Sequence, residues 1–282
     1  MSYPEKVYLN GEIRKTEEAK ISVFDRGFIF GDGIYEVMVQ INGRFFYGDA
    51  HFNRLKYCLR KIGIEYDVSR LGTEIPRLLE EVKLTSEDCL IYIQVTRGVA
   101  PRQHSFPKGV EPTVFMYAIP KVLPKINESH IEVVTQQDYR WTKCDIKTTS
   151  LLGNILANEH AMNNNCFETL FIRDGQITEA SHCNVFFIKD SKVYTHPANQ
   201  FILNGITRQI VLELCERLNI EVIEEGISIS DIESYDESFL TGTSTQIASI
   251  KKIDKYFLYT DERVGPITRI LQEAYKELKF QN

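Results

Sequence analysis

The residues best suited to chemistry lie in residues 139–157, which read YRWTKCDIKTTSLLGNILA. Lys147 is a candidate nucleophile there. A free lysine has a pKa of about 10.4, so at neutral pH it is protonated and does not attack a carbonyl. Burial beside apolar residues such as Trp141 and Ile146, or a second cation such as Lys143, lowers a lysine pKa and allows Schiff-base formation. The alternative is an ordinary solvated lysine at a strand end, so other residues must decide.

Four more segments carry residues suited to a charged ligand. They read DRGFIFGDGIYEV at 25–37, VTRGVAPRQHSFP at 95–107, ITEASHCNVF at 177–186 and LNGITRQIV at 203–211. With the lysine segment they resemble, in order and approximate spacing, the pyridoxal-phosphate enzymes of fold type IV, most of all the D-amino-acid aminotransferases. One such segment alone is a weak signal. The likeness covers nearly the whole chain, and five segments in order are specific.

The resemblance implies pyridoxal 5′-phosphate as cofactor. Lys147 matches the family's lysine that forms the Schiff base with the cofactor and then moves the substrate Cα proton. Glu179 matches the carboxylate that hydrogen-bonds the pyridine nitrogen and keeps it protonated, because an opposite charge favours the charged form. Without the resemblance, Glu179 is an ordinary carboxylate at a strand end. The cofactor itself supplies the electron sink.

A phosphate site is expected where Gly205 precedes a helix, since the first amides and the dipole of a helix attract a dianion. Many helices begin after a glycine, so the pattern alone is weak. Arg54 suits phosphate geometry, although an exposed helix arginine explains it equally well. The resemblance implies contacts to the phosphate from Ile206, Thr207, Thr243 and Arg54, and packing of Leu203 against the ring.

Substrate recognition is expected from Arg102, His104 and Tyr35. An arginine, a histidine and a phenol that converge on one point bind a carboxylate through charge-assisted hydrogen bonds. By composition alone, the PRQH stretch is a solvated loop. The resemblance implies instead that this loop reaches the active site of a neighbouring subunit, and hence a homodimer.

The chain departs from the family pattern at two places. Gly242 stands where the family has a serine near the phosphate, so a hydroxyl contact is lost or replaced by the backbone amide. Ser181-His182-Cys183 stands where the family has a run of serines, so His182 and Cys183 both depart from the pattern. By the same resemblance, His182 either narrows the side-chain pocket, adds a donor or favours acidic side chains. Val37 and Ser244 are implied as its neighbours in that pocket.

The function that these expectations define is ping-pong transamination. A D-amino acid such as D-alanine or D-glutamate gives its amino group to a 2-oxo acid such as 2-oxoglutarate. Two alternatives share the fold: a branched-chain L-amino-acid aminotransferase and an aminodeoxychorismate lyase. The Arg-x-His pair of the PRQH loop disfavours both. A non-catalytic pyridoxal-phosphate-binding protein is disfavoured by the joint presence of Lys147, Glu179, Tyr35 and Arg102.

Composition excludes several other classes. The chain has 282 residues, 43% of them apolar and 26% charged, as expected for a globular protein with a real core. The net charge is −6 and no long basic run occurs, which disfavours nucleic acid as a partner. No apolar stretch suits a signal peptide or a membrane span, so a cytoplasmic protein is expected. Six scattered cysteines without a CxxC pair, and histidines without HExxH spacing, predict reduced thiols and no metal site.

Periodicity predicts an α+β fold with mixed sheets. Apolar spacing indicates helices at 50–62, 73–84, 151–164, 207–218 and 266–279. Asn-Gly or Asp-Gly pairs at 10–11, 42–43 and 174–175 predict three hairpins. Prolines and polar residues at 120–129 predict a linker between domains 1–119 and 130–282. The resemblance implies a small amino-terminal α/β domain and a larger carboxy-terminal pseudobarrel with Lys147, with the cofactor bound between them.

Overall fold

The computed structural model describes residues 3–126, 130–258 and 264–281. The chain forms two compact units, of which the first comprises Met1–Val122 and Ile146–Leu151 and the second Leu123–Asp145 and Leu152–Asn282. Lys147 therefore groups with the first unit, whereas the sequence-based expectation placed it in the carboxy-terminal domain. Residues 127–129 of the expected linker lie outside the described residues, and the expected boundaries at 119 and 130 stay a prediction.

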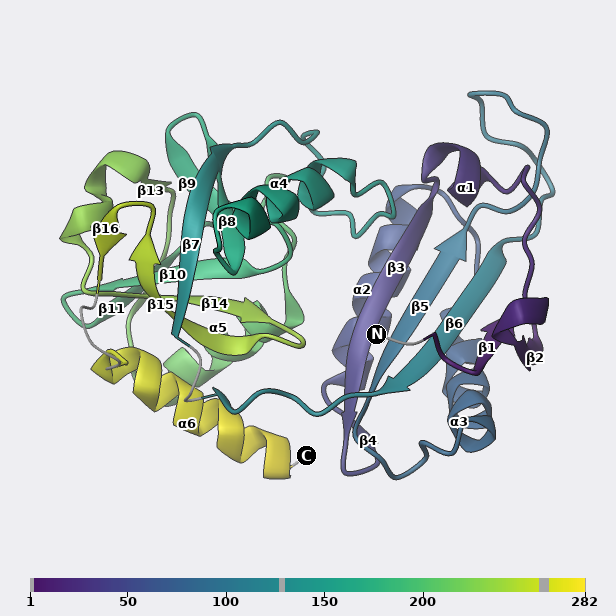
Figure 1. Ribbon diagram of the computed structural model, residues 1–282, viewed down its shortest axis with the longest axis horizontal. Helices are drawn as coiled ribbons and strands as arrows, with labels where there is room; N and C mark the ends of the chain where they lie inside the picture. The colour runs from purple at the N-terminus through teal and green to yellow at the C-terminus, as the bar shows by residue number, and fades with distance from the viewer. Residues whose placement is uncertain (1–2, 127–129, 259–263, 282) are drawn as a thin grey trace. The chain divides into compact units, whose positions relative to one another are not determined.

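The first unit is built on a six-stranded sheet, and antiparallel pairing runs through it in the order β2-β1-β6-β5-β3-β4 (Figure 1). Its central strands are rich in β-branched and aromatic residues, which favour a pleated, half-buried surface. The strands are β1 Lys6–Leu9, β2 Glu12–Lys15, β3 Gly33–Ile41, β4 Arg44–Phe45, β5 Cys89–Thr96 and β6 Thr113–Pro120.

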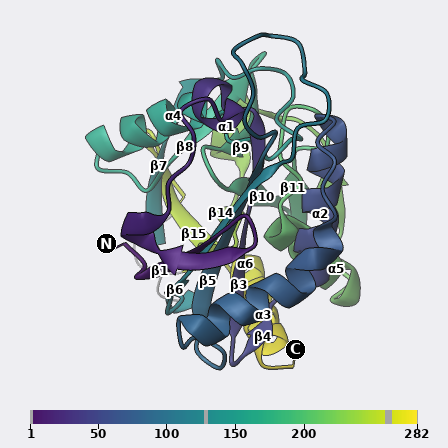
Figure 2. The same cartoon turned by 90° about the vertical axis from the view of Figure 1, so that its right-hand side faces the viewer.

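Helices α2 (Gly48–Lys61) and α3 (Leu71–Glu81) cover one face of this sheet (Figure 2). Their apolar positions recur at helical spacing and form one core with the strand residues that alternate toward them. The opposite sheet face keeps half-buried side chains. Three short elements complete the unit: α1 Arg26–Phe30, η1 Thr16–Glu18 and η2 Val68–Arg70.

The second unit contains a curled mixed sheet of ten strands (Figure 1). Nine strands follow the order β12-β11-β10-β14-β15-β7-β8-β9-β13, and β16 pairs with β15. Pairing is parallel at β11–β12, β15–β7 and β7–β8, and antiparallel elsewhere. The strands are β7 His130–Gln137, β8 Glu168–Arg173, β9 Gln176–Ala180, β10 Asn184–Lys189, β11 Lys192–Thr195, β12 Val222–Glu224, β13 Ile227–Ser228, β14 Glu237–Gly242, β15 Gln246–Ile253 and β16 Tyr256–Phe257.

Helices of the second unit pack against this sheet. Helix α4 contacts β7 and β8, while α5 and α6 contact each other and β14. Strand β8 reads as buried at five successive positions, as expected for a strand with two covered faces. The helices are α4 Leu152–Asn163, α5 Ile206–Arg217, α6 Pro266–Gln281 and η4 Ile229–Ser234.

The predicted α+β class is confirmed, as are the five helices, to within a few residues at their ends. All three predicted hairpins are confirmed as β1–β2, β3–β4 and β8–β9. Their Asn10, Asn42 and Asp174 all adopt positive φ, the backbone conformation that these turns require. Over the residues that the structure describes, no helix combines the length and apolarity needed to cross a membrane.

Candidate active site

Lys147 is fixed to the first unit by its backbone. Its carbonyl accepts from the Tyr35 amide at 3.0 Å, and its own amide donates to Cys58 Sγ at 3.4 Å. The hydroxyl run that follows extends this attachment: Thr149 Oγ1 donates to the Gly31 carbonyl at 2.9 Å, and Ser150 Oγ to the same carbonyl at 3.0 Å. Residues 147–149 thus pair through their backbone with the start of β3. This pairing explains why Lys147 groups with the first unit.

The Lys147 side chain is half-buried, with Nζ 4.1 Å from the centre of the Tyr35 ring. Tyr35 in turn stacks on Tyr92, with ring centroids 5.8 Å apart. Val37 follows two residues later on the same strand face, also half-buried. The predicted nucleophile and two predicted substrate contacts therefore share one aromatic face of the sheet.

Glu36, between those two residues, points to the opposite, covered face. It is wholly buried and receives two bonds from Arg54, Nε to Oε2 at 2.9 Å and Nη2 to Oε1 at 2.7 Å. His51 Nδ1 lies 3.0 Å from Glu36 Oε1. Burial acts to raise the pKa of Glu36, but the charges and hydrogen bonds of Arg54 and His51 together outweigh burial and hold that pKa far below its usual range.

Arg54 is thus held in place by a carboxylate rather than solvated as a free helix arginine. Burial acts to lower the pKa of Arg54, but the charge of Glu36 and its hydrogen bonds with Arg54, with smaller contributions from neighbouring groups, more than reverse this, so the pKa is raised overall. Burial also lowers the pKa of His51, which keeps the imidazole neutral at neutral pH. The site therefore presents one guanidinium that is already oriented by a bidentate partner.

The loop with Arg102 and His104 is anchored on helix α1. Arg26 Nη1 donates to the Gln103 carbonyl at 2.6 Å. The Arg102 guanidinium lies 5.3 Å from the centre of the Phe30 ring, and the His104 ring centroid lies 6.0 Å from it. Both side chains are exposed. The structure brings these two predicted residues together, while Tyr35 lies with Lys147 and Tyr92.

Asp32 holds the base of this loop. Its carboxylate accepts from Arg26 Nε at 2.7 Å and from Arg97 Nε at 2.8 Å. Burial acts to raise the pKa of Asp32, but hydrogen bonds from the two arginines lower it on balance. The Arg97 guanidinium also lies 3.6 Å from the centre of the Phe106 ring. The DRGFIFGDG and TRG segments therefore serve to position the loop.

In the second unit, Glu179 ends β9 as a buried carboxylate. Arg140 Nη1 donates to Oε1 at 2.8 Å, and the Leu203 amide donates to Oε2 at 3.0 Å. Arg140 is shared, because it also binds Asp138 through Nε at 3.0 Å. Burial raises the pKa of Glu179 to about 7, even though Arg140 opposes the shift. The carboxylate is therefore only partly compensated by positive charge.

The predicted phosphate contacts Ile206 and Thr207 form the buried first turn of α5. The helix N-cap is Gly205, which adds no side-chain hydrogen bond to the first-turn amides. An uncapped helix N-terminus of this kind suits an anion. Leu203, just before it, is half-buried and bonded to Glu179 through its amide.

The turn after β14 carries the other predicted contacts of this unit. Thr243 and Ser244 are half-buried within it. A Cβ on Gly242 would lie 3.1 Å from Cys183 Sγ and 3.3 Å from Thr245 Oγ1. That space is tight, so a side chain at this position requires the neighbours to shift.

His182 is held by a buried partner that the sequence did not reveal. Its Nδ1 lies 2.6 Å from Glu168 Oε2, and its ring is 49% exposed at the side chain. Burial acts to raise the pKa of Glu168, while the hydrogen bond from His182 contributes to lowering it overall. Glu168, His182 and Cys183 each offer one potential metal ligand, within 4.8 Å of one another. The expectation of no metal stays a prediction.

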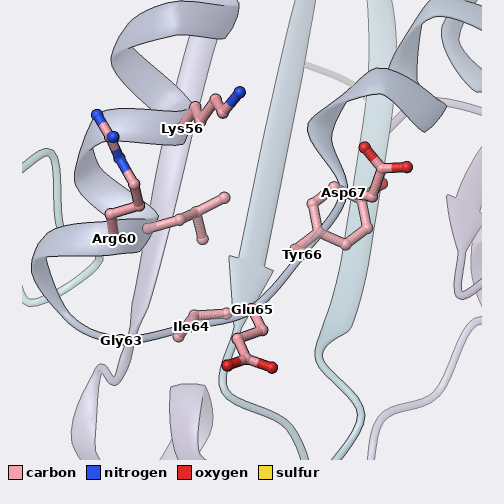
Figure 3. Close-up of a pocket in the computed structure, with 8 residues that line it drawn as sticks. Lys56, Arg60, Gly63, Ile64, Glu65, Tyr66 and Asp67 are labelled. Atoms are coloured by element: carbon pink, nitrogen blue, oxygen red, sulfur yellow. The ribbon is translucent and has the colours of Figure 1, made fainter.

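A cleft of about 610 Å³ lies at the carboxyl end of α2 and is lined by exposed charged residues. Lys56 and Arg60 extend from the helix, and Glu65 points away from them (Figure 3). Its charged groups do not converge on one point. None of the predicted site residues lines this cleft.

Five residues escaped the sequence reasoning: Glu36, His51, Arg140, Glu168 and Asn184. Glu36, Arg140 and Asn184 lie inside the segments already singled out. Of these, Glu36 left a detectable signal, because it alternates with the apolar residues Ile34 and Met38 of its strand and a charge at such a position requires a buried partner.

Comparisons with known proteins give the class. The family model of amino-transferase class IV matches residues 33–253, so the chain belongs to the class-IV aminotransferases. The chain is 41% identical over 277 residues to the D-alanine aminotransferase of Staphylococcus aureus (strain N315), covering 97% of both chains. It is 37% identical over 272 residues to the D-alanine aminotransferase of Bacillus licheniformis, covering 95% of both.

Solved structures show the same fold. The Escherichia coli branched-chain amino acid aminotransferase matches with a TM-score of 0.90 at 22% identity, over 98% of this chain and 94% of that one. The branched-chain aminotransferase of Thermoproteus uzoniensis, solved with norvaline, matches with a TM-score of 0.88 at 25% identity, over 98% and 95%. The fold-type IV architecture is thereby confirmed.

Class-IV aminotransferases use pyridoxal 5′-phosphate, and the residues present fit that cofactor. The undercompensated carboxylate of Glu179 suits a protonated pyridine nitrogen, since an additional cation lowers the energy of a buried anion. The uncapped N-terminus of α5 suits a phosphate. A half-buried lysine completes the set that the cofactor needs.

Proposed function

We propose that this protein is a D-amino-acid transaminase that moves the amino group of D-alanine, D-glutamate or a similar D-amino acid to a 2-oxo acid such as 2-oxoglutarate. The observation that carries the proposal is the 41% identity to a D-alanine aminotransferase over 97% of both chains. The raised pKa of buried Glu179 supports the use of pyridoxal phosphate independently of the identity. A purely structural carboxylate would be fully paired, whereas Glu179 would be stabilised further by a protonated pyridine nitrogen. As a compartment we propose the cytoplasm, which is supported by the lack of a disulfide among the six cysteines, all of them within the described residues.

When bound, pyridoxal phosphate supplies the electron sink that stabilises negative charge at the substrate Cα. Lys147 Nζ would hold the cofactor covalently and, when free, would take the proton from the substrate Cα. Glu179 holds the proton of the pyridine nitrogen by its charge. Arg140 orients that carboxylate through its 2.8 Å bond.

The phosphate would be held by the first amides of α5 at Ile206 and Thr207, together with Thr243 and Arg54. The two hydrogen bonds that Arg54 donates to Glu36 fix its guanidinium before the anion arrives, which reduces the ordering cost of binding. Gly242 contributes its backbone. Leu203 packs against the ring.

Substrate recognition combines two groups of residues. Arg102 and His104 bind the α-carboxylate together with Tyr35, while Val37, His182 and Ser244 line the side-chain pocket. We place Arg102 and His104 at the site of a neighbouring subunit in a homodimer. Their exposure on the surface of the first unit supports this, since an exposed arginine anchored by its backbone is available to a partner.

Subunit mixing tests the homodimer. Neither Arg102→Ala nor Lys147→Ala homodimers contain a complete site, whereas a mixed dimer contains one. We expect mixing after partial unfolding to restore up to about a quarter of wild-type turnover, the statistical yield of intact sites in random pairing. Activity that stays absent, with dimers demonstrated by light scattering, contradicts the exchange of the loop.

A branched-chain L-amino-acid aminotransferase is the second candidate, favoured by the structural neighbours alone. Absorbance of the purified protein with pyridoxal phosphate separates the two. A visible band of the lysine-bound cofactor should bleach with D-alanine and return with 2-oxoglutarate. Bleaching only with L-leucine would move the protein to the branched-chain class. A band that persists in Lys147→Ala would refute the role of Lys147.

A further inference from the structure

Three segments of the second unit that we propose to bind the cofactor are connected through one buried residue, Asn184. The first segment is the end of β9 with Glu179, the second is the loop that leads from Leu203 into α5, and the third is the turn after β14. These segments are far apart in the chain. Something must hold them at a fixed spacing if one rigid cofactor is to touch all three.

Asn184 is 5% exposed, and its amide nitrogen donates two hydrogen bonds. Its Nδ2 donates to Glu179 Oε2 at 3.2 Å and to the Leu203 carbonyl at 2.8 Å. Its Oδ1 packs against Gly205, so closely that a Cβ at Gly205 would overlap it. One planar group therefore links the carboxylate to the residue that begins α5.

The backbone of Asn184 completes the link to the third segment. Asn184 is the first residue of β10 and is paired with Thr241 of β14 in antiparallel register. Strand β14 ends at Gly242 and leads directly into the turn with Thr243. The three segments are thus connected through a single residue by its donors, its oxygen and its strand pairing.

We propose that Asn184 is a positioning residue that sets the spacing between the carboxylate for the pyridine nitrogen and the helix terminus for the phosphate. The inference rests on the proposed function, because it assumes that Glu179 and α5 hold the two ends of pyridoxal phosphate. A group that only stabilised the sheet would need no donors toward both ends. Asparagine meets the requirement because it offers two donors and one acceptor in a plane.

Two variants test the assignment. Asn184→Ala removes both donors and leaves the Leu203 carbonyl without this partner. Asn184→Asp keeps almost the same shape against Gly205 but donates to neither acceptor. The matched control is Ser238→Ala, which removes another buried hydrogen bond of the same sheet, from Ser238 Oγ to the Phe186 carbonyl at 2.8 Å.

The measurement is equilibrium binding to the cofactor-free protein of two probes, pyridoxal phosphate and pyridoxal. Both engage Lys147 and the ring site, and only the first engages α5. We expect Asn184→Ala to reduce the ratio of the two affinities about tenfold, the effect of one to two lost hydrogen bonds. Ser238→Ala should leave the ratio at the wild-type value.

Asn184→Asp should also reduce the ratio of the affinities for pyridoxal phosphate and pyridoxal. If the alanine variant does not fold, the aspartate variant tests the positioning role. Equal weakening of both probes, or an unchanged ratio, in the folded variant would overturn the positioning role. Binding of neither probe by the wild-type protein would instead overturn the proposed function, and the positioning role with it.

Discussion

Glu36 and Glu179 are both buried glutamates, but their pKa values shift in opposite directions. The pKa of Glu36 is far below its usual range, whereas burial raises that of Glu179 to about 7. Glu36 accepts two hydrogen bonds from the guanidinium of Arg54 and has a further neighbour in His51. Glu179 shares its guanidinium with Asp138, because Arg140 binds both.

The difference shows how one fold assigns two roles to one residue type. Desolvation raises the pKa of both carboxylates, and the direction of the net pKa shift depends on how much neighbouring positive charge offsets desolvation. Glu36 is fully paired and serves to orient Arg54. The positive charge near Glu179 does not fully offset its desolvation, and a protonated pyridine nitrogen would supply the additional positive charge. A perturbed pKa of this kind is typical of functional sites.

The largest expected effect is on stability, from Glu36→Gln. The substitution leaves Arg54 buried without its counter-charge, and breaking a buried pair in this way costs about 3–5 kcal/mol. Urea unfolding of the variant and wild type measures the difference. The control is Glu81→Gln, which breaks an exposed pair with Lys6 and should leave the unfolding midpoint unchanged. A loss for Glu36→Gln no larger than that of the control would contradict the anchor role.

Protonation of Glu36 should also make the free energy of unfolding decrease at acid pH. Because the folded pKa of Glu36 lies below the unfolded value, its contribution is present at neutral pH and is lost as pH falls through the acid range. Unfolding free energies measured from pH 7 downward should therefore converge for wild type and Glu36→Gln. Parallel curves would show that the ionised form carries no stability.

The next effect is the reverse pH dependence at Glu179, measured on cofactor-free protein. Between the model value of 4.5 and about 7, the folded state holds a proton that the unfolded state has released. The unfolding free energy of wild type should therefore fall, relative to Glu179→Gln, by on the order of 3 kcal/mol as pH rises through that window. Glu132→Gln, at an ion-paired carboxylate near the surface, is the control without such a trend. A wild-type curve that rises instead would show that Arg140 compensates Glu179 fully.

The smallest effect is expected from His51→Asn, which replaces the neutral imidazole beside Glu36 with another uncharged polar group. The cost should be about 1 kcal/mol, the typical net value of one hydrogen bond. Burial lowers the pKa of His51, so the unfolded state takes up its proton first and stability falls as pH drops below 6.5. The substituted amide cannot titrate, and thermal unfolding across about pH 5–7 should show a shallower slope in the variant. An unchanged slope would assign the acid sensitivity to other groups.

Local patterns predicted a large part of the fold. The Asn-Gly and Asp-Gly pairs give hairpins because their φ values are fixed by residues next to each other in the chain. Helix α1 was missed because Arg26–Phe30 is short and contains a glycine, so its stability comes from Asp25 at the N-cap and from Gly98, whose carbonyl accepts from the Arg26 amide. The contact with Gly98 lies outside any local sequence window.

In the candidate site, too, residues recognised from local sequence patterns differ from residues whose roles depend on contacts in space. The predicted roles of Lys147, Glu179, Arg102 and the other site residues stay predictions, although the structure gives each a location. The partners Arg140, Glu168 and Asn184 were overlooked, because a hydrogen-bonded amide or charge looks the same in sequence as a solvated one. Only burial distinguishes them.

By itself, the sequence determined the family, the α+β class and the identity of the candidate nucleophile, since each depends on residues in fixed order along the chain. Tertiary structure alone decided that residues 146–151 join the first unit, that Arg54 donates to the buried Glu36, and that Glu179 keeps a raised pKa. The physical reason is that desolvation and charge pairing depend on neighbours in space. Two glutamates with similar local sequence signals therefore end with opposite electrostatic roles.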